Sequence, residues 1–144
     1  MDKLLVGLND YKVLDYDNPI GYTRDINCCL VALIHRERSS TLMHIESYKY
    51  NIEIDNFIKC LKNEKDNKIL RVDIFKGENT ELGNLSVIKF ILHRLNIDYK
   101  VYDVFKNLSN ETSIGYNFNS HKYFIVSMNK GKPIFKVKDL KKNY

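Results

Sequence analysis

The segment that decides the fold of this chain is CLVALIHRERSSTLMHI, residues 29–45 of a sequence of 144 residues. It contains two short apolar runs, at residues 30–34 and 41–45, separated by a charged and polar stretch at residues 35–40. Short apolar runs bounded by polar clusters are typical of strands, and consecutive strands usually pair with each other. The segment therefore predicts one β-hairpin whose turn is centred near Arg38.

The predicted hairpin brings a thiol close to an imidazole. With a turn near Arg38, residues whose numbers add up to the mid-seventies face each other, so His44 lies opposite Val31 and within side-chain reach of Cys29. Only a thiolate is strongly nucleophilic and a free Cys has a pKa of about 8.5, so a catalytic thiol needs a base such as imidazole. Spacing alone leaves two interpretations open, which are a nucleophile with its base and a small buried hydrophobe near a hydrogen-bonded histidine.

The residues before Cys29 favour the first interpretation. Thr23 lies six positions upstream, Ile26 lies three positions upstream, and Cys28 is adjacent. This segment resembles the active-site segment of the CheD family of chemoreceptor glutamine deamidases, in which a Thr, a Leu, a Gly-Ser pair and the catalytic Cys lead into a strand rich in Val and Ala. A His at the end of the following strand completes the family's site, as His44 would here. The same arrangement occurs in the cytotoxic necrotizing factor toxins, which share the deamidase fold.

The resemblance extends along most of the chain. Segments similar to the family's first two strands, its glycine-containing segment, the start of its second long helix and a later strand are residues 5–13, 74–79, 82–83 and 99–104. The chain differs from the family at Asn27 and Cys28, where the family has Gly and Ser, at Lys76 and Glu78, and at residues 107–114, where a Gly-Arg-Arg-like stretch is missing. Asn tolerates a left-handed backbone better than most residues, so the turn before the nucleophile is expected to persist.

The resemblance implies a protein-glutamine deamidase that needs no cofactor and no metal. Cys29 would be the nucleophile, His44 the general acid and base, and Thr23 the hydroxyl that orients the imidazole. The expected reaction converts a Gln side chain of a chemoreceptor cytoplasmic domain into Glu through a thioester, with release of ammonia. Backbone N–H groups of residues 27–29 are expected to stabilise the tetrahedral oxyanion.

Cys28 is an alternative nucleophile, because an alignment shifted by one residue would exchange the two thiols. Neighbouring residues of a strand point to opposite faces, so only one of the two is expected to face His44. The six-residue spacing to Thr23 and the apolar run that begins at Leu30 favour Cys29.

Length and composition bound the class of protein. A length of 144 residues fits a single domain, residues 1–144, whose core needs no disulfide. Three cysteines without zinc-site spacing indicate a reducing cytoplasm. The N-terminal apolar run is too short for a signal peptide, and no apolar stretch reaches about 18 residues, so we expect a cytoplasmic protein that is not membrane-spanning. The net charge of +5 comes from scattered lysines and a basic C-terminal tail, which predicts no nucleic-acid partner.

Two stretches have the apolar spacing of an amphipathic helix, and a third region predicts a second hairpin. The helical positions are Ile54, Phe57, Ile58 and Leu61, then Ile88, Ile91, Leu92 and Leu95. Apolar residues at 123–128 and 134–137 flank a glycine-containing turn at residues 129–133. The sequence therefore predicts a layered α+β domain in which mixed or antiparallel β-sheets, packed like a β-sandwich, carry two amphipathic helices, as in a CheD-like fold.

Two other functions stay open on the same resemblance. CheD proteins also bind the chemotaxis phosphatase CheC, so the first alternative is a regulator with little or no deamidase activity. The altered glycine-containing segment favours this alternative, whereas the retained Thr23, Cys29 and His44 argue against it. The second alternative is a toxin-like deamidase or transglutaminase acting on a foreign protein, which the full-length similarity to CheD makes the less favoured.

Overall fold

The computed structural model describes residues 3–26, 28–46, 51–77, 82–103 and 113–138. These residues form ten strands and two helices. In chain order they are β1 (Lys3–Val6), β2 (Tyr11–Leu14), β3 (Ile20–Thr23), β4 (Cys29–Arg36), β5 (Ser40–Glu46), α1 (Asn51–Cys60), β6 (Ile69–Lys76), α2 (Leu82–Arg94), β7 (Tyr99–Asp103), β8 (Ile114–Asn117), β9 (Lys122–Asn129) and β10 (Lys132–Val137).

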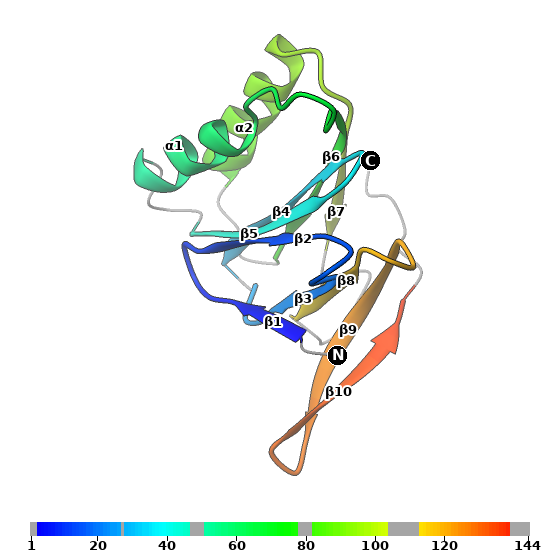
Figure 1. Ribbon diagram of the computed structural model, residues 1–144. Helices are drawn as coiled ribbons and strands as arrows, with labels where there is room; N and C mark the ends of the chain where they lie inside the picture. Colours follow the sequence, from blue (N-terminus) through cyan, green and yellow to red (C-terminus); the bar gives the residue numbers. More distant parts are fainter. Residues whose placement is uncertain (1–2, 27, 47–50, 78–81, 104–112, 139–144) are drawn as a thin grey trace.

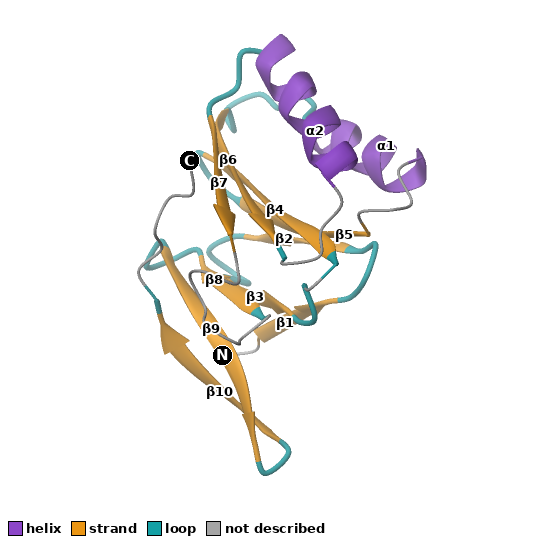
Figure 2. Cartoon of the chain, turned by 180° about the vertical axis from the view of Figure 1, so that it is seen from behind, coloured by secondary structure: helices purple, strands orange, loops and turns teal. Residues whose placement is uncertain are grey.

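The elements are arranged in three layers (Figures 1 and 2). A five-stranded sheet with the strand order β2-β5-β4-β6-β7 forms the middle layer, and both helices cover one of its faces. A second five-stranded sheet, β1-β3-β8-β9-β10, covers the other face. Each sheet is mixed, because β1 runs parallel to β3 and β6 runs parallel to β7. The layered α+β class predicted from the sequence is confirmed.

The hairpin of β4 and β5 is buried on both faces. On β4, the side chains of Leu30, Ala32 and Ile34 pack in the core beneath the helices, whereas Val31 and Leu33 pack against the second sheet. A strand covered on both faces has no solvent-facing side, so its sequence is continuously apolar and does not alternate with polar residues. This double burial is the physical reason for the apolar run that predicts the strand.

The hairpin register predicted from the sequence is confirmed. His44 pairs with Val31, and the pairing continues without a shift to Cys29 opposite Glu46 at the open end of the hairpin. Directly paired residues of antiparallel strands point to the same face, as do residues two apart along one strand. Cys29, Val31, His44 and Glu46 therefore share the face turned toward the second sheet.

The predicted turn at residues 35–40 is wrong at both ends. His35 and Arg36 belong to β4 and Ser40 to β5, and all three are buried. Their polar groups are satisfied inside the protein: the Arg36 guanidinium donates to the backbone oxygens of Cys60, Lys62 and Asn67 at 2.6–2.9 Å. Local composition cannot reveal partners so distant in sequence, and for this reason a polar strand end was expected to be a turn.

The two helices bury most of their predicted apolar stripes. Ile91 is partly buried, whereas Ile58 on α1 and Leu95, just beyond the end of α2, are exposed. The buried members are Ile54, Phe57, Leu61, Ile88 and Leu92.

The last hairpin, β9–β10, is confirmed with a shorter turn than expected. Lys130 and Gly131 make the turn with φ values of 51° and 76°, the left-handed region that two-residue hairpin turns require. Pro133 consequently lies within β10, which is an edge strand and so tolerates a residue without an N–H donor.

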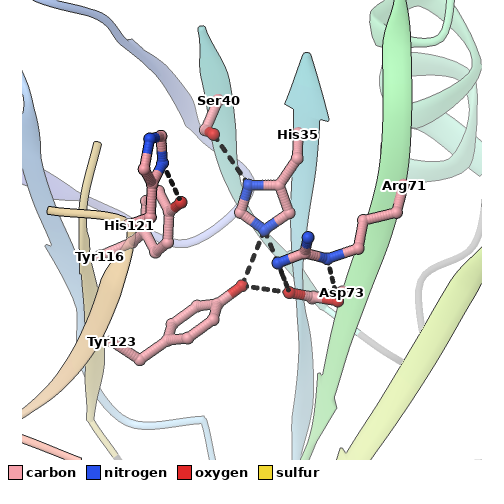
Figure 3. Close-up of polar contacts among 7 residues, drawn as sticks. All are labelled: His35, Ser40, Arg71, Asp73, Tyr116, His121 and Tyr123. Atoms are coloured by element: carbon pink, nitrogen blue, oxygen red, sulfur yellow. Dashed lines mark hydrogen bonds and ion pairs between the residues drawn. The ribbon is translucent and has the colours of Figure 1, made fainter. Parts of the chain in front are cut away.

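A buried polar cluster joins the two sheets at the turn end of the β4–β5 hairpin (Figure 3). His35 Nε2 donates to Asp73 Oδ2 at 3.0 Å, and the hydroxyl of Tyr123 donates to the same oxygen at 2.5 Å. His35 and Asp73 belong to the middle sheet, whereas Tyr123 belongs to the second sheet. Ser40 Oγ lies 2.8 Å from His35 Nδ1, and Arg71 pairs with the Asp73 carboxylate. The cluster therefore ties the two sheets together through hydrogen bonds.

Replacing Asp73 with Asn should destabilise the protein by an amount on the order of 3 kcal/mol, because it leaves buried donors without their charged acceptor. Burial alone would raise the pKa of Asp73, but hydrogen bonds from His35 and Tyr123 and the neighbouring charges of His35 and Arg71 hold it below its ordinary value of 3.8. The ionised Asp73 carboxylate therefore contributes to the free energy of unfolding above pH 3.8, and this contribution is lost as the pH falls below that value. Urea unfolding of wild type and Asp73→Asn at pH 7 and pH 3 should show a stability difference that narrows in acid. Asp98→Asn, an exposed control, should change stability by less than about 0.5 kcal/mol.

Candidate active site

The three residues singled out in the sequence meet between the two sheets. Cys29 is the first residue of β4, His44 lies on β5, and Thr23 is the last residue of β3 in the second sheet. Their exposed fractions are 4%, 3% and 0%. Cys29 and His44 line one cavity of about 490 Å³, whose other wall comes from β1 and the residues that follow it. The arrangement places a buried thiol and a buried imidazole on the wall of one cavity, which exposed residues such as Arg24 and Asp25 also line.

The hydrogen bonds around the imidazole define which nitrogen is the base. His44 Nδ1 lies 2.6 Å from Thr23 Oγ1, and the Thr23 hydroxyl donates its single proton to the Val6 backbone oxygen at 2.8 Å. Thr23 can therefore only accept from His44, so we assign the proton to Nδ1. Nε2 then carries a lone pair, and it is buried without a hydrogen-bond partner among the residues that the structure describes. A buried nitrogen without a hydrogen-bond partner is costly in a structure and therefore requires an explanation.

The backbone of His44 is held as firmly as its ring. Its N–H donates to the Asp10 backbone oxygen at 3.2 Å, and its backbone oxygen accepts from the Asn9 N–H at 2.9 Å. Asn9 has a φ of 59°, so the turn between β1 and β2 reaches this position through a left-handed residue. The imidazole is thereby positioned from both sheets.

The surroundings of His44 favour its neutral form. Burial lowers the pKa of His44 below its ordinary value of 6.5, and the negative charges of Asp25 and Glu46 offset only part of this effect. At neutral pH the ring is therefore unprotonated. A neutral imidazole is the form that can remove a proton from a thiol.

The candidate cavity contains two neighbouring thiols. Cys28 and Cys29 both line the cavity, and their sulfur atoms lie 3.9 Å apart. Cys28 precedes the first residue of β4, so the alternation of a strand does not apply to it. Strand pairing nevertheless places Cys29, and not Cys28, on the ladder face that carries His44.

The expected oxyanion donors are also corrected in part. The Cys29 N–H already donates to the Ile26 backbone oxygen at 2.7 Å, so it is occupied in this arrangement. Asn27 lies outside the described residues, and the left-handed residue of this turn is Asp25, with a φ of 60°. Arg24 lines the cavity and is the only cationic side chain among the described lining residues.

Glu46 and Asn9 belong to this site, although neither was singled out in the sequence. Glu46 is buried, lines the cavity and lies opposite Cys29 in the hairpin. Its position two residues after His44 could have indicated that both share one face. Asn9 gave no such signal, because it is 37 residues from Glu46 along the chain.

The cluster around His35 contains the residue types of a catalytic triad, but its serine is not accessible to a substrate. Ser40, His35 and Asp73 are linked in that order by hydrogen bonds (Figure 3). Ser40 is only 1% exposed, so no substrate reaches its hydroxyl. We therefore interpret this cluster as a structural connection between the sheets.

Neither described helix is long and apolar enough to cross a membrane. Within the same residues, no group of three or more His, Cys, Asp and Glu side chains is arranged to hold a metal ion. No protein-family model matches the sequence, and no curated protein matches it either.

His44 should titrate below pH 6.5, because burial disfavours its imidazolium form. The measurement is an NMR titration of the ring protons of His44, assigned by comparison with His44→Gln. The same histidine in the urea-unfolded chain is the control and should titrate near 6.5. A midpoint above 6.5 in the folded protein would contradict the neutral-base assignment.

Replacing Thr23 with Val should destabilise the chain by about 1–3 kcal/mol, because the His44 Nδ1–H and the Val6 oxygen lose their buried partner. It should also release the imidazole from a single tautomer, which 15N chemical shifts of the ring report. Thr23→Ser, which keeps the hydroxyl, should restore both properties. A single Nδ1–H tautomer in Thr23→Val would show that another group orients the ring.

Proposed function

We propose that the chain is a cysteine-dependent amidohydrolase and, within that class, a protein-glutamine deamidase of the CheD kind. The observation that carries the proposal is the buried Nε2 of His44, which has no hydrogen-bond partner among the described residues. Thr23 holds the ring through Nδ1, and His44 lines the cavity that Cys29 also lines. A nucleophile, a base and a group that orients the base form the minimal set for nucleophilic acyl transfer. The choice of Gln, and of a chemoreceptor as the protein that bears it, depends on the resemblance of residues 23–29 to the CheD segment.

The first half of the proposed reaction forms a thioester. His44 Nε2 removes the proton from the Cys29 sulfur, and the thiolate attacks the carboxamide carbon of the substrate Gln. The C=O π electrons move to oxygen, and Arg24 is the candidate donor for this oxyanion because the Cys29 N–H is occupied. When the oxyanion collapses, the C–N bond breaks, His44 gives its proton to the leaving nitrogen, and ammonia departs.

The second half hydrolyses the thioester. His44, neutral again, removes a proton from water, and the resulting hydroxide attacks the thioester carbon. The C–S bond breaks, and His44 returns its proton to the Cys29 sulfur. The product is Glu in place of Gln, and no step requires a redox partner or a cofactor.

The rim of the cavity supports a polypeptide substrate. Leu5 and Leu8 line the cavity and are each about half exposed. Exposed aliphatic side chains beside a reactive group offer apolar contact to residues that flank the reacting one. Free glutamine has no such flanking residues, so the rim favours a Gln within a protein. The cytoplasm as the place of action, and CheC as a further partner, belong to the same proposal.

Incubation with a chemoreceptor cytoplasmic domain should convert Gln to Glu, a gain of roughly one dalton that mass spectrometry can localise. Cys29→Ala and His44→Ala should each reduce the rate at least about 10³-fold, because each removes a group that moves a proton or forms the thioester. Cys28→Ala should still form product.

Matched controls are available on the same chain. Cys60→Ala removes a thiol at the end of α1, and His93→Ala removes an exposed imidazole on α2. Both should leave the rate of Gln conversion unchanged. Deamidation that persists in Cys29→Ala but is lost in Cys28→Ala would move the nucleophile by one residue, and deamidation that persists in both would contradict the mechanism.

A further inference from the structure

A buried carboxylate stands beside the thiol of the candidate site. Glu46 pairs directly with Cys29 across the β4–β5 ladder, so the two side chains start about 4.5–5.5 Å apart on the same face. Glu46 is 5% exposed and lines the same cavity as Cys29 and His44. Deprotonation of Cys29 by His44 does not use this group. A charged group placed so close to the reacting sulfur needs another role or a purely structural explanation.

The carboxylate is held in place by Asn9. The Asn9 side-chain amide donates from Nδ2 to Glu46 Oε2 at 3.2 Å, and its Oδ1 accepts from the Glu46 backbone N–H at 3.1 Å. The backbone N–H of Asn9 donates to the His44 backbone oxygen. One residue therefore positions both the general base and the carboxylate. A carboxylate accepts up to about four hydrogen bonds, of which the bond from Asn9 is one.

The charge of Glu46 distinguishes an amide from an acid. The carboxamide of Gln is neutral and has an NH₂ group that can donate to a carboxylate, whereas the carboxylate of Glu is anionic and has no donor. Cys29, His44 and Glu46 are each at most 5% exposed, and repulsion between two like charges beside such buried groups is stronger than in bulk water. Among the described charged residues that line the cavity, Asp25 adds a second negative charge and Arg24 supplies the single positive one.

We propose that Glu46 is the specificity-determining residue of this site, accepting a hydrogen bond from the NH₂ of the substrate carboxamide and repelling the carboxylate of the product. The proposal rests on the proposed function for its substrate, but its chemical content is the selection of a neutral amide over an anion at Cys29. The same repulsion expels the Glu product, so the deamidated protein should be a poor inhibitor. Release of the product then requires no conformational step.

Two alkylating reagents test this selection without a protein substrate. Iodoacetamide carries a neutral carboxamide and iodoacetate carries a carboxylate, and both alkylate a thiolate by displacing iodide. The rate of each reaction at Cys29 is measured on the purified full chain by peptide mass spectrometry. The ratio of the two rates is divided by the same ratio for free glutathione, so that the intrinsic reactivity of the reagents cancels.

Wild-type Cys29 should prefer iodoacetamide by about tenfold beyond the glutathione ratio, because the anionic reagent meets the Glu46 charge. Glu46→Gln, which keeps the shape and removes the charge, should bring the ratio close to that of glutathione. Glu46→Asp keeps the charge and should retain the preference. Asp98→Asn, which removes an exposed negative charge elsewhere on the chain, should leave the ratio unchanged.

The outcomes separate this proposal from the proposed function. A wild-type ratio equal to that of glutathione, or an unchanged ratio in Glu46→Gln, would overturn the role of Glu46 even if the chain deamidates a receptor. A Cys29 that reacts with neither reagent would also overturn it, because a small carboxamide then has no access to the sulfur. A strong preference in wild type, removed in Glu46→Gln, would support it even if chemoreceptors are not the substrate. If Glu46→Gln does not fold, a wild-type ratio equal to that of glutathione still overturns the proposal, and Asp25→Asn separates the two carboxylates of the cavity: a retained preference in Asp25→Asn supports Glu46, and a lost preference overturns its role.

Discussion

The β4–β5 hairpin is buried on both of its faces, and this double burial fixes the register of its strands and the position of the candidate site. One face of these strands forms the core beneath the two helices, and the other forms the core against the second sheet. A shift of the pairing by one residue would move every side chain of one strand to the opposite face. Such a shift would place His44 beneath the helices and large apolar residues between the sheets. The packing of two cores thus enforces the register that brings Cys29, His44 and Glu46 onto one face.

The face of this hairpin that packs against the second sheet has a polar cluster at each end, one around His35 and one around His44. The two clusters differ in whether their polar groups have partners. Around His35, both ring nitrogens have close partners and the serine hydroxyl is shut away from solvent. Around His44, one ring nitrogen is bound by Thr23, whereas the other has no partner among the described residues and belongs to a residue that lines a cavity. A fully satisfied buried network rigidifies a fold, whereas an unsatisfied buried group requires an explanation. We take that explanation to be chemistry at Cys29.

Electrostatics at the candidate site combine opposing effects. Burial lowers the pKa of His44 and keeps the ring available as a base, while Asp25 and Glu46 partly restore the stability of its protonated form. A base that takes a proton from a thiol and returns it to a leaving group must be able to adopt both its neutral and its protonated form. Asn9 links these effects structurally, because it binds the backbone of His44 and the carboxylate of Glu46. The turn between β1 and β2 is therefore part of the site, although no motif in it indicates this.

The hairpin, its register and the two helices could be predicted from the sequence, because these features depend on the spacing of apolar residues along short segments. The proximity of Cys29 and His44 followed from that register, and the candidate role of Thr23 came from the resemblance of the segment before Cys29. The folded chain was needed to show that Thr23 binds His44 Nδ1, that Cys28 shares the cavity, that the Cys29 N–H is occupied, and that His35 is buried. These contacts join residues up to 88 positions apart and depend on how two sheets and a turn stack against each other. Local periodicity carries no information about such stacking, so the geometry of the site could be established only from the folded chain.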